Sequence, residues 1–112
     1  DEWSEELVAI EARAKERAAI LLFVISAETR AMASVAEAAE YVVRGRSIVL
    51  VIQDVPVGAT FGGERVSAAE LKDLNRSRSY LRDISVRHAV TCAHTVAEAT
   101  ELVVTRFRSQ RQ

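Results

Sequence analysis

The sequence predicts a single α/β domain built on a parallel β-sheet, and three observations support this fold class. The chain has 112 residues, which is enough for one hydrophobic core and too few for two. Apolar residues make up 49% of it and charged residues 28%, as in ordinary globular domains. Two uninterrupted apolar runs, Ile20–Ile25 and Ile48–Ile52, alternate with segments of helical periodicity. Such runs are typical of parallel strands that helices cover on both faces.

The first half of the chain is expected to form a helix, a strand, a helix and a strand, at Trp3–Ala18, Ile20–Ile25, Ser34–Arg44 and Ile48–Ile52. In the first helix, Trp3, Leu7 and Ile10 recur at helical spacing and form an apolar stripe. The second helix has the same periodicity, and Gly45 supplies its stop signal.

The second half is expected to form a loop, a helix, a strand and a helix, at residues 54–66, Ala68–Arg87, Ala89–Ala93 and from Val96 through Phe107. The loop holds clustered glycines and the only proline, so it is expected to be the most mobile element. In the long helix, Leu74 and Leu81 belong to the inner stripe, and Arg78 is expected on a solvated face. Residues 109–112 are expected to fray.

This order of elements predicts a three-layer α/β/α domain of the flavodoxin-like, doubly wound type that spans residues 1–112. Three strands make a small sheet of this kind. The run Ile20–Ile25 would then have an unpaired apolar edge, which favours association with another chain. We therefore expect that one or two strands preceding Asp1 are lacking, and that the chain forms a homodimer or higher homo-oligomer.

Charge and cysteine content exclude several classes of partner. The formal net charge is -1, so no overall field draws the chain to a nucleic acid polymer or a membrane surface. The basic residues Arg106, Arg108 and Arg111 are most simply the solvated end of a helix. Cys92 is the only cysteine and is expected to pack as a small apolar residue. With no leader and no run long enough to span a membrane, the sequence predicts a cytoplasmic protein.

The segment Ser26–Glu40 is the expected site, because ligands of open α/β sheets bind at the carboxyl ends of the strands. It combines acidic residues with an arginine and hydroxyl groups. Glu37 and Glu40 lie three residues apart on one helix face, and Glu28 can approach from the preceding loop. Glycosyl chemistry uses paired carboxylates of this kind.

On spacing alone, the simpler interpretation of Glu37 is structural. The pattern Ser34-x-x-Glu37 is a capping box, in which each side chain satisfies a free backbone N–H of the other residue. The same pattern recurs at the next two helix starts, at Ser67-x-x-Glu70 and Thr95-x-x-Glu98. Nothing at those two positions suggests chemistry.

No motif predicts a metal or a cofactor. His88, His94 and Cys92 lack the spacing of metal ligands. Neither the glycine fingerprint of dinucleotide-binding domains nor the phosphate loop follows either apolar run. We therefore expect no metal site and no cofactor.

The run Leu21–Asp54, LLFVISAETRAMASVAEAAEYVVRGRSIVLVIQD, resembles the nucleoside 2-deoxyribosyltransferase-like family. In that family an apolar strand leads to a hydroxyl, a glutamate three residues on, a small-residue helix, a glycine followed by a basic residue, and another apolar strand. The matching residues are Ser34, Glu37, Ala38, Ala39, Gly45 and Arg46. The resemblance continues through Asp73–Leu81 and the last strand and helix.

The resemblance implies cleavage or exchange of the N-glycosidic bond of a nucleoside or nucleotide, with Glu37 as the nucleophile. It also implies oligomers in which neighbouring subunits complete the site. Ala31 stands where the family has an aspartate that handles the base, and Ala39 where it has a glycine. The residues expected around the substrate are Glu28, Thr29, Arg30, Ser34, Asp54 and Asn75.

Two alternatives stay open. The missing acid at Ala31 favours a non-catalytic domain that binds a nucleotide or a protein on the same fold. A phosphate-binding regulatory domain would instead use Arg30, Arg44 and Arg46. The sequence leaves the base and the sugar open.

Overall fold

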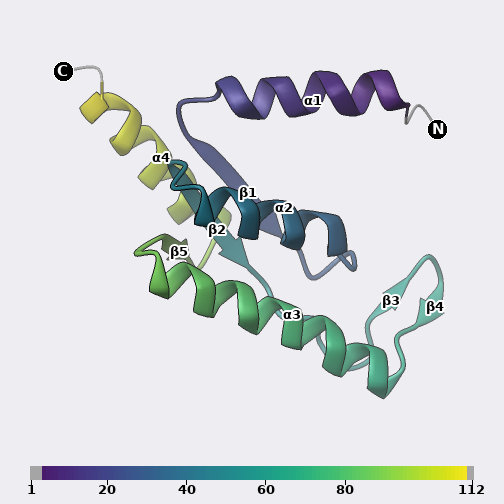
Figure 1. Cartoon of the computed structure of the whole chain (residues 1–112). Helices are drawn as coiled ribbons and strands as arrows, with labels where there is room; N and C mark the ends of the chain where they lie inside the picture. Colours follow the sequence, from purple (N-terminus) through teal and green to yellow (C-terminus); the bar gives the residue numbers. More distant parts are fainter. Residues whose placement is uncertain (1–3, 111–112) are drawn as a thin grey trace.

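The computed structural model describes residues 4–110, without the side chains at positions 11, 12 and 16, and contains an open parallel sheet with helices on both faces (Figure 1). It confirms the predicted α/β fold class. The predicted stripe residue Trp3 and the last two residues lie outside this range. The elements are α1 (Glu5–Arg17), β1 (Leu21–Ile25), α2 (Met32–Val43), β2 (Ile48–Ile52), β3 (Thr60–Phe61), β4 (Glu64–Arg65), α3 (Ala68–Arg87), β5 (Thr91–Ala93) and α4 (Val96–Gln110).

The three main strands are parallel and lie in the order β1-β2-β5. β2 is central, with Leu21 of β1 opposite Ile48 and Cys92 of β5 opposite Leu50. Val49, Leu50 and Val51 are fully buried, as expected of a strand that is paired on both edges and covered on both faces. The strand order places the carboxyl ends of β1 and β2 side by side at one edge of the sheet.

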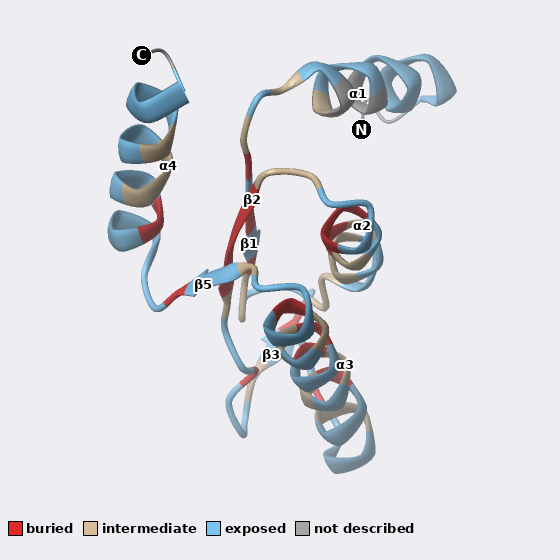
Figure 2. Cartoon of the chain, turned by 60° about the vertical axis from the view of Figure 1, so that its left-hand side comes forward, coloured by how far each residue is buried: buried red, intermediate tan, exposed pale blue. Residues whose placement is uncertain are grey.

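The two faces of the sheet have separate cores (Figure 2). On one face, α2 and α3 pack against alternate residues of β1 and β2, among them Phe23 and Leu50. On the other face, α4 places Ala99 against Val49 and Val51. α1 is held at its C-terminal end, where Arg46 donates hydrogen bonds to the carbonyl oxygens of Lys15, in its last turn, and of Ala18.

β1 is covered on one face only, although its sequence predicts cover on both. Leu22 and Val24 point to the α4 side of the sheet and remain 39% and 37% exposed. Beside them, an apolar cavity of about 510 Å³ separates Ile20 from Val103 and Phe107 of α4. The outer edge of β1 pairs with no other strand of residues 4–110. The continuous apolar run therefore indicates that both faces of β1 are suited to burial, although the described residues cover only one of them.

The capping box predicted at Ser34 is wrong, because α2 begins at Met32, two residues before the predicted start. Its N-cap is Ala31, in the left-handed conformation with φ of 56°, and no side chain caps the helix. The serine half of the pattern does form at Ser67, whose Oγ accepts from the backbone N–H of Glu70 at 3.1 Å. Thr95 caps α4 in the same way. The spacing from hydroxyl residue to glutamate is the same at the three helix starts, so it did not show that α2 lacks a side-chain cap.

Three further expectations need correction. The predicted loop 54–66 contains the β3–β4 hairpin and its own small core, in which Val55, Phe61 and Val66 pack with Leu74 of α3. Cys92 is exposed, because β5 is a short edge strand and this residue, opposite Leu50, lies on the face of the sheet away from α4. α4 continues to Gln110, so the predicted fraying does not apply to residues 109 and 110.

Among the described residues, no helix combines the length and apolarity needed to cross a membrane.

Candidate functional site

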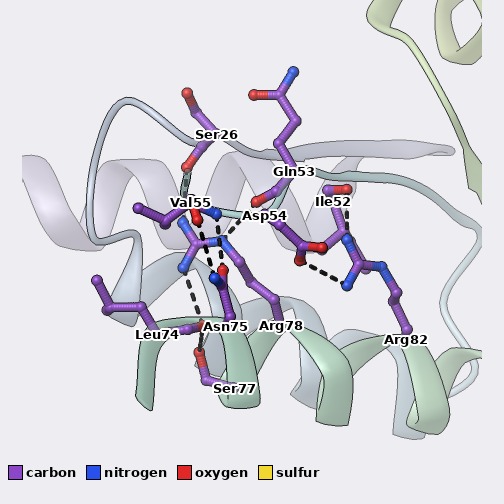
Figure 3. A network of polar contacts seen from close by, with 10 residues as sticks. All are labelled: Ser26, Ile52, Gln53, Asp54, Val55, Leu74, Asn75, Ser77, Arg78 and Arg82. Carbon is purple, nitrogen blue, oxygen red and sulfur yellow. Dashed lines mark hydrogen bonds and ion pairs between the residues drawn. The ribbon is translucent and has the colours of Figure 1, made fainter. Parts of the chain in front are cut away.

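The candidate site is built around Arg78, a fully buried arginine of α3 that joins the loops following β1 and β2 (Figure 3). Its Nε donates to the carbonyl oxygen of Gln53 at 2.7 Å, and its Nη2 donates to that of Ser26 at 2.8 Å. Three longer hydrogen bonds reach the carbonyl oxygens of Thr29, Arg30 and Leu74. One guanidinium therefore sets the relative position of the two loops at the carboxyl edge of the sheet.

The energetic cost of burying this cation is offset by the carbonyl dipoles that point at it. Removal from water lowers the pKa of Arg78, and the negative charge of Asp54 partly offsets that effect. The carbonyl oxygens supply the partners that a buried charge requires. The prediction that Arg78 lies on a solvated face is wrong, because the residue is fully buried. A signal was present, because position 78 falls four residues after Leu74 and three before Leu81, within the inner stripe of α3.

Side chains from α3 and from the loop after β2 brace the same two loops. The Asn75 side chain pairs with the backbone of Val55, accepting from its N–H at 2.8 Å and donating to its carbonyl at 3.0 Å. Gln53 accepts from the N–H of Ala27 at 3.0 Å. Arg82 donates to Asp54 at 2.9 Å. Asp54 and Asn75, which we expected at the substrate, are thus engaged with the protein itself.

Arg30 closes the loop after β1 onto α3. Its Nε lies 2.6 Å from a carboxylate oxygen of Glu70, and its guanidinium lies over the Phe61 ring at 5.0 Å. This hydrogen bond raises the pKa of Arg30 and lowers the pKa of Glu70. From its sequence pattern Glu70 was expected only in a capping box, and its pairing with Arg30 was not predicted. Nothing in the local sequence links positions forty residues apart.

Glu37 lies on α2 and turns toward α1. One oxygen of its carboxylate accepts from Nζ of Lys15 at 2.8 Å, and 44% of its side chain remains exposed. The same ammonium group lies 5.5 Å from the ring centroid of Phe23 in β1. Glu40, the second acid of the predicted pair, faces Arg44 at 3.5 Å. The two carboxylates therefore have separate basic partners.

The predicted site residues fall into two groups. Arg30, Asp54 and Asn75 contact α3 or the loops that α3 braces, whereas Glu37 contacts α1. Thr29 belongs to the first group through its carbonyl oxygen, which accepts from Arg78. Glu28 is exposed on the loop after β1 and Ser34 is half-buried in the first turns of α2. No hydrogen bond or ion pair between described residues joins Glu37 to the first group, the α3 group, which consists of Thr29, Arg30, Asp54 and Asn75.

No group of three or more histidine, cysteine, aspartate or glutamate residues within 4–110 could hold a metal ion.

These features define an open α/β domain with polar residues gathered at the carboxyl edge of its sheet. Residues 1–55 match the model of a family described as nucleoside 2-deoxyribosyltransferase like, which supports the predicted family for the N-terminal part of the chain. The match includes α1, β1, α2 and β2, and hence Glu37. The predicted resemblance over Asp73–Leu81 and the last strand and helix lies beyond it. Searches among curated proteins and solved structures find no match.

Proposed function

We propose that this protein cleaves or exchanges the N-glycosidic bond of a nucleoside or nucleotide, with Glu37 as the nucleophile. The observation that carries the proposal is the family match, which spans Glu37 and both strands beside it. The local geometry is compatible, because the Glu37 carboxylate is partly exposed and the Lys15 ammonium group holds one of its oxygens at 2.8 Å.

In the proposed reaction, a Glu37 oxygen forms a bond to the anomeric carbon while the bond from that carbon to the base nitrogen breaks. The departing base takes a proton, and the resulting glycosyl ester is resolved by water or by a second base. Asp54 accepts a hydrogen bond from Arg82 at 2.9 Å. Glu28, which is exposed on the loop after β1, is therefore the better candidate for the proton donor.

The test is to incubate the full chain with deoxynucleosides and follow release of the free base by chromatography. Glu37→Gln keeps the shape of the side chain and should abolish release. Glu40→Gln is the matched control, because it removes the same charge one helical turn later on α2. Intact-mass measurement should detect a glycosyl adduct on the control variant and none on Glu37→Gln. Equal release by both variants would rule out the mechanism.

A non-catalytic nucleotide-binding or protein-binding domain is the second candidate. It is favoured by the separation of Glu37 from the α3 group and by Ala31, which provides no acid at the start of α2. It predicts no base release by the unmodified chain together with saturable nucleotide or protein binding in calorimetry.

We also propose that the protein is intracellular and forms homo-oligomers. The exposed free thiol of Cys92 is compatible with a reducing compartment. The open edge of β1 supports self-association, because Leu22 and Val24 are exposed beside unpaired backbone groups.

A further inference from the structure

A second cavity, with polar walls, lies at the end of the sheet opposite the candidate site, where β2 and β5 begin. Its volume is about 300 Å³, and it is separate from the loops that Arg78 joins. Its polar walls come from three segments of the chain: the α2–β2 connection, the α3–β5 connection with the start of β5, and α4. The polar side chains that line it are those of Arg46, Ser47, His88, Thr91 and Arg106.

Arg106 brings to this cavity a positive charge that no carboxylate of the described residues pairs with. Its Nη1 donates to Ser47 Oγ at 3.0 Å and to the carbonyl oxygen of Ile48 at 3.3 Å. Both acceptors are neutral, and no described carboxylate forms an ion pair with Arg106. The side chain is half-buried, so water screens its charge less than at an open surface. The protein contacts position the guanidinium and leave its charge available.

The rest of the lining contributes further hydrogen-bond donors. Arg46 is anchored at the wall, where its Nη2 donates to the carbonyl oxygens of Lys15 and Ala18 at 2.7 and 2.8 Å. The His88 imidazole and the Thr91 hydroxyl are further donors. None of the described residues that line the cavity is acidic.

We propose that this cavity binds a small dianion, either inorganic phosphate or the terminal phosphate of a phosphate monoester. Guanidinium groups match the oxygens of phosphate with paired hydrogen bonds, and hydroxyls supply additional donors. The volume lies near the lower limit for ligand cavities, which suits phosphate alone or phosphate with a small organic group. Of the arginines predicted to bind phosphate, only Arg46 lines this cavity, since Arg30 contacts Glu70 at the other end of the sheet.

The first experiment is an NMR titration of the full chain at low ionic strength, with the backbone amides assigned. Inorganic phosphate, ribose 5-phosphate and uncharged ribose are added separately. Phosphate and ribose 5-phosphate should shift the amides of Ser47 and Thr91 in a saturable way, while those of Ala27 and Glu28 stay in place. Ribose should have no effect. Tighter binding of the monoester would assign the site to phosphorylated small molecules, and equal affinities would assign it to free phosphate.

Two arginine variants test the role of charge. Arg106→Gln should weaken phosphate binding by about tenfold or more, the loss of one charge-assisted contact. Arg108→Gln is the control, because it removes the same charge two residues later on α4 and Arg108 does not line this cavity. Because Arg106 also contacts Ser47, circular dichroism is used to check that the Arg106→Gln variant keeps the fold. Thr91→Val provides a second variant, which should weaken phosphate binding several-fold.

The proposal is overturned if about 10 mM phosphate, well above the Kd of a millimolar site, produces no saturable shift. It is also overturned if Arg106→Gln and Arg108→Gln lose affinity equally, because general attraction to a basic helix end would explain that result. Neither outcome affects base release through Glu37, so this site and the proposed function are tested independently.

Discussion

Replacement of Arg78 by methionine should loosen the two loops at the carboxyl edge of the sheet. Methionine has a similar length and no charge, so it keeps most of the packing of α3 while removing all five hydrogen bonds to carbonyl oxygens. The three shortest, at 2.7, 2.8 and 3.1 Å, reach Gln53, Ser26 and Thr29. Those carbonyls would lose their charged donor.

The magnitude follows from these contacts. A hydrogen bond to a charged group contributes about 1.5–3 kcal/mol, so the three shortest bonds together contribute roughly 4–9 kcal/mol. Methionine avoids the cost of burying a cation, which offsets several kcal/mol of that loss. The free energy of unfolding should therefore fall by about 2–4 kcal/mol, equivalent to a decrease in Tm of roughly 10–20 °C in a domain of this size.

The assay combines urea unfolding with amide hydrogen exchange. Arg76→Met is the matched control, because it removes the same charge from an exposed position of the same helix and should change stability by less than about 0.5 kcal/mol. In Arg78→Met, exchange should accelerate most at residues 26–31 and 53–55. Equal stability of the two variants, or acceleration spread evenly over the chain, would refute the role assigned to Arg78.

Three further outcomes are expected. Because Arg30 lowers the pKa of Glu70, this pair stabilises the fold above the ordinary glutamate pKa, and the contribution is lost as pH falls through the lowered value. Glu70→Gln should therefore reduce stability at neutral pH and flatten its decline in acid, as measured by urea unfolding across that range; an unchanged acid decline would contradict this. Val24→Lys should convert the proposed oligomer to a monomer in sedimentation experiments, and a monomeric unmodified chain would contradict the proposal. Ala31→Gly should raise the free energy of unfolding by up to about 1 kcal/mol, because alanine is strained at a φ of 56°; a loss of stability would show that the strain is absent.

The two groups of site residues determine which functional experiments are informative. The residues of the α3 group form short hydrogen bonds and ion pairs with other residues of the protein. Substitutions there are therefore expected to change stability as well as any activity. Glu37 and Lys15 form a more exposed pair on α2 and α1. Substitution of Glu37 should therefore affect chemistry with little loss of fold, which makes Glu37→Gln the cleaner functional probe.

Local patterns in the sequence were sufficient for the main elements. Continuous apolar runs identified β1 and β2, since the central strand of a parallel sheet is buried on both faces. The bounds of α3 follow from the Ser67 cap and the apolar spacing after it. The same local rules failed at α2, where Ala31 adopts a left-handed conformation that no cap residue announces.

The class of fold, the order of its elements and the resemblance that singles out Glu37 could therefore be predicted, because they depend on residues close together in the chain. Three contacts became apparent only from the folded chain: Arg78 is buried and binds both loops, Arg30 pairs with Glu70, and Glu37 pairs with Lys15. Such contacts join residues 22 to 52 positions apart. The Arg78 contacts form because the parallel sheet brings the carboxyl ends of β1 and β2 together beside α3, and the Glu37–Lys15 contact forms because α1 and α2 approach each other. Local periodicity does not encode either arrangement.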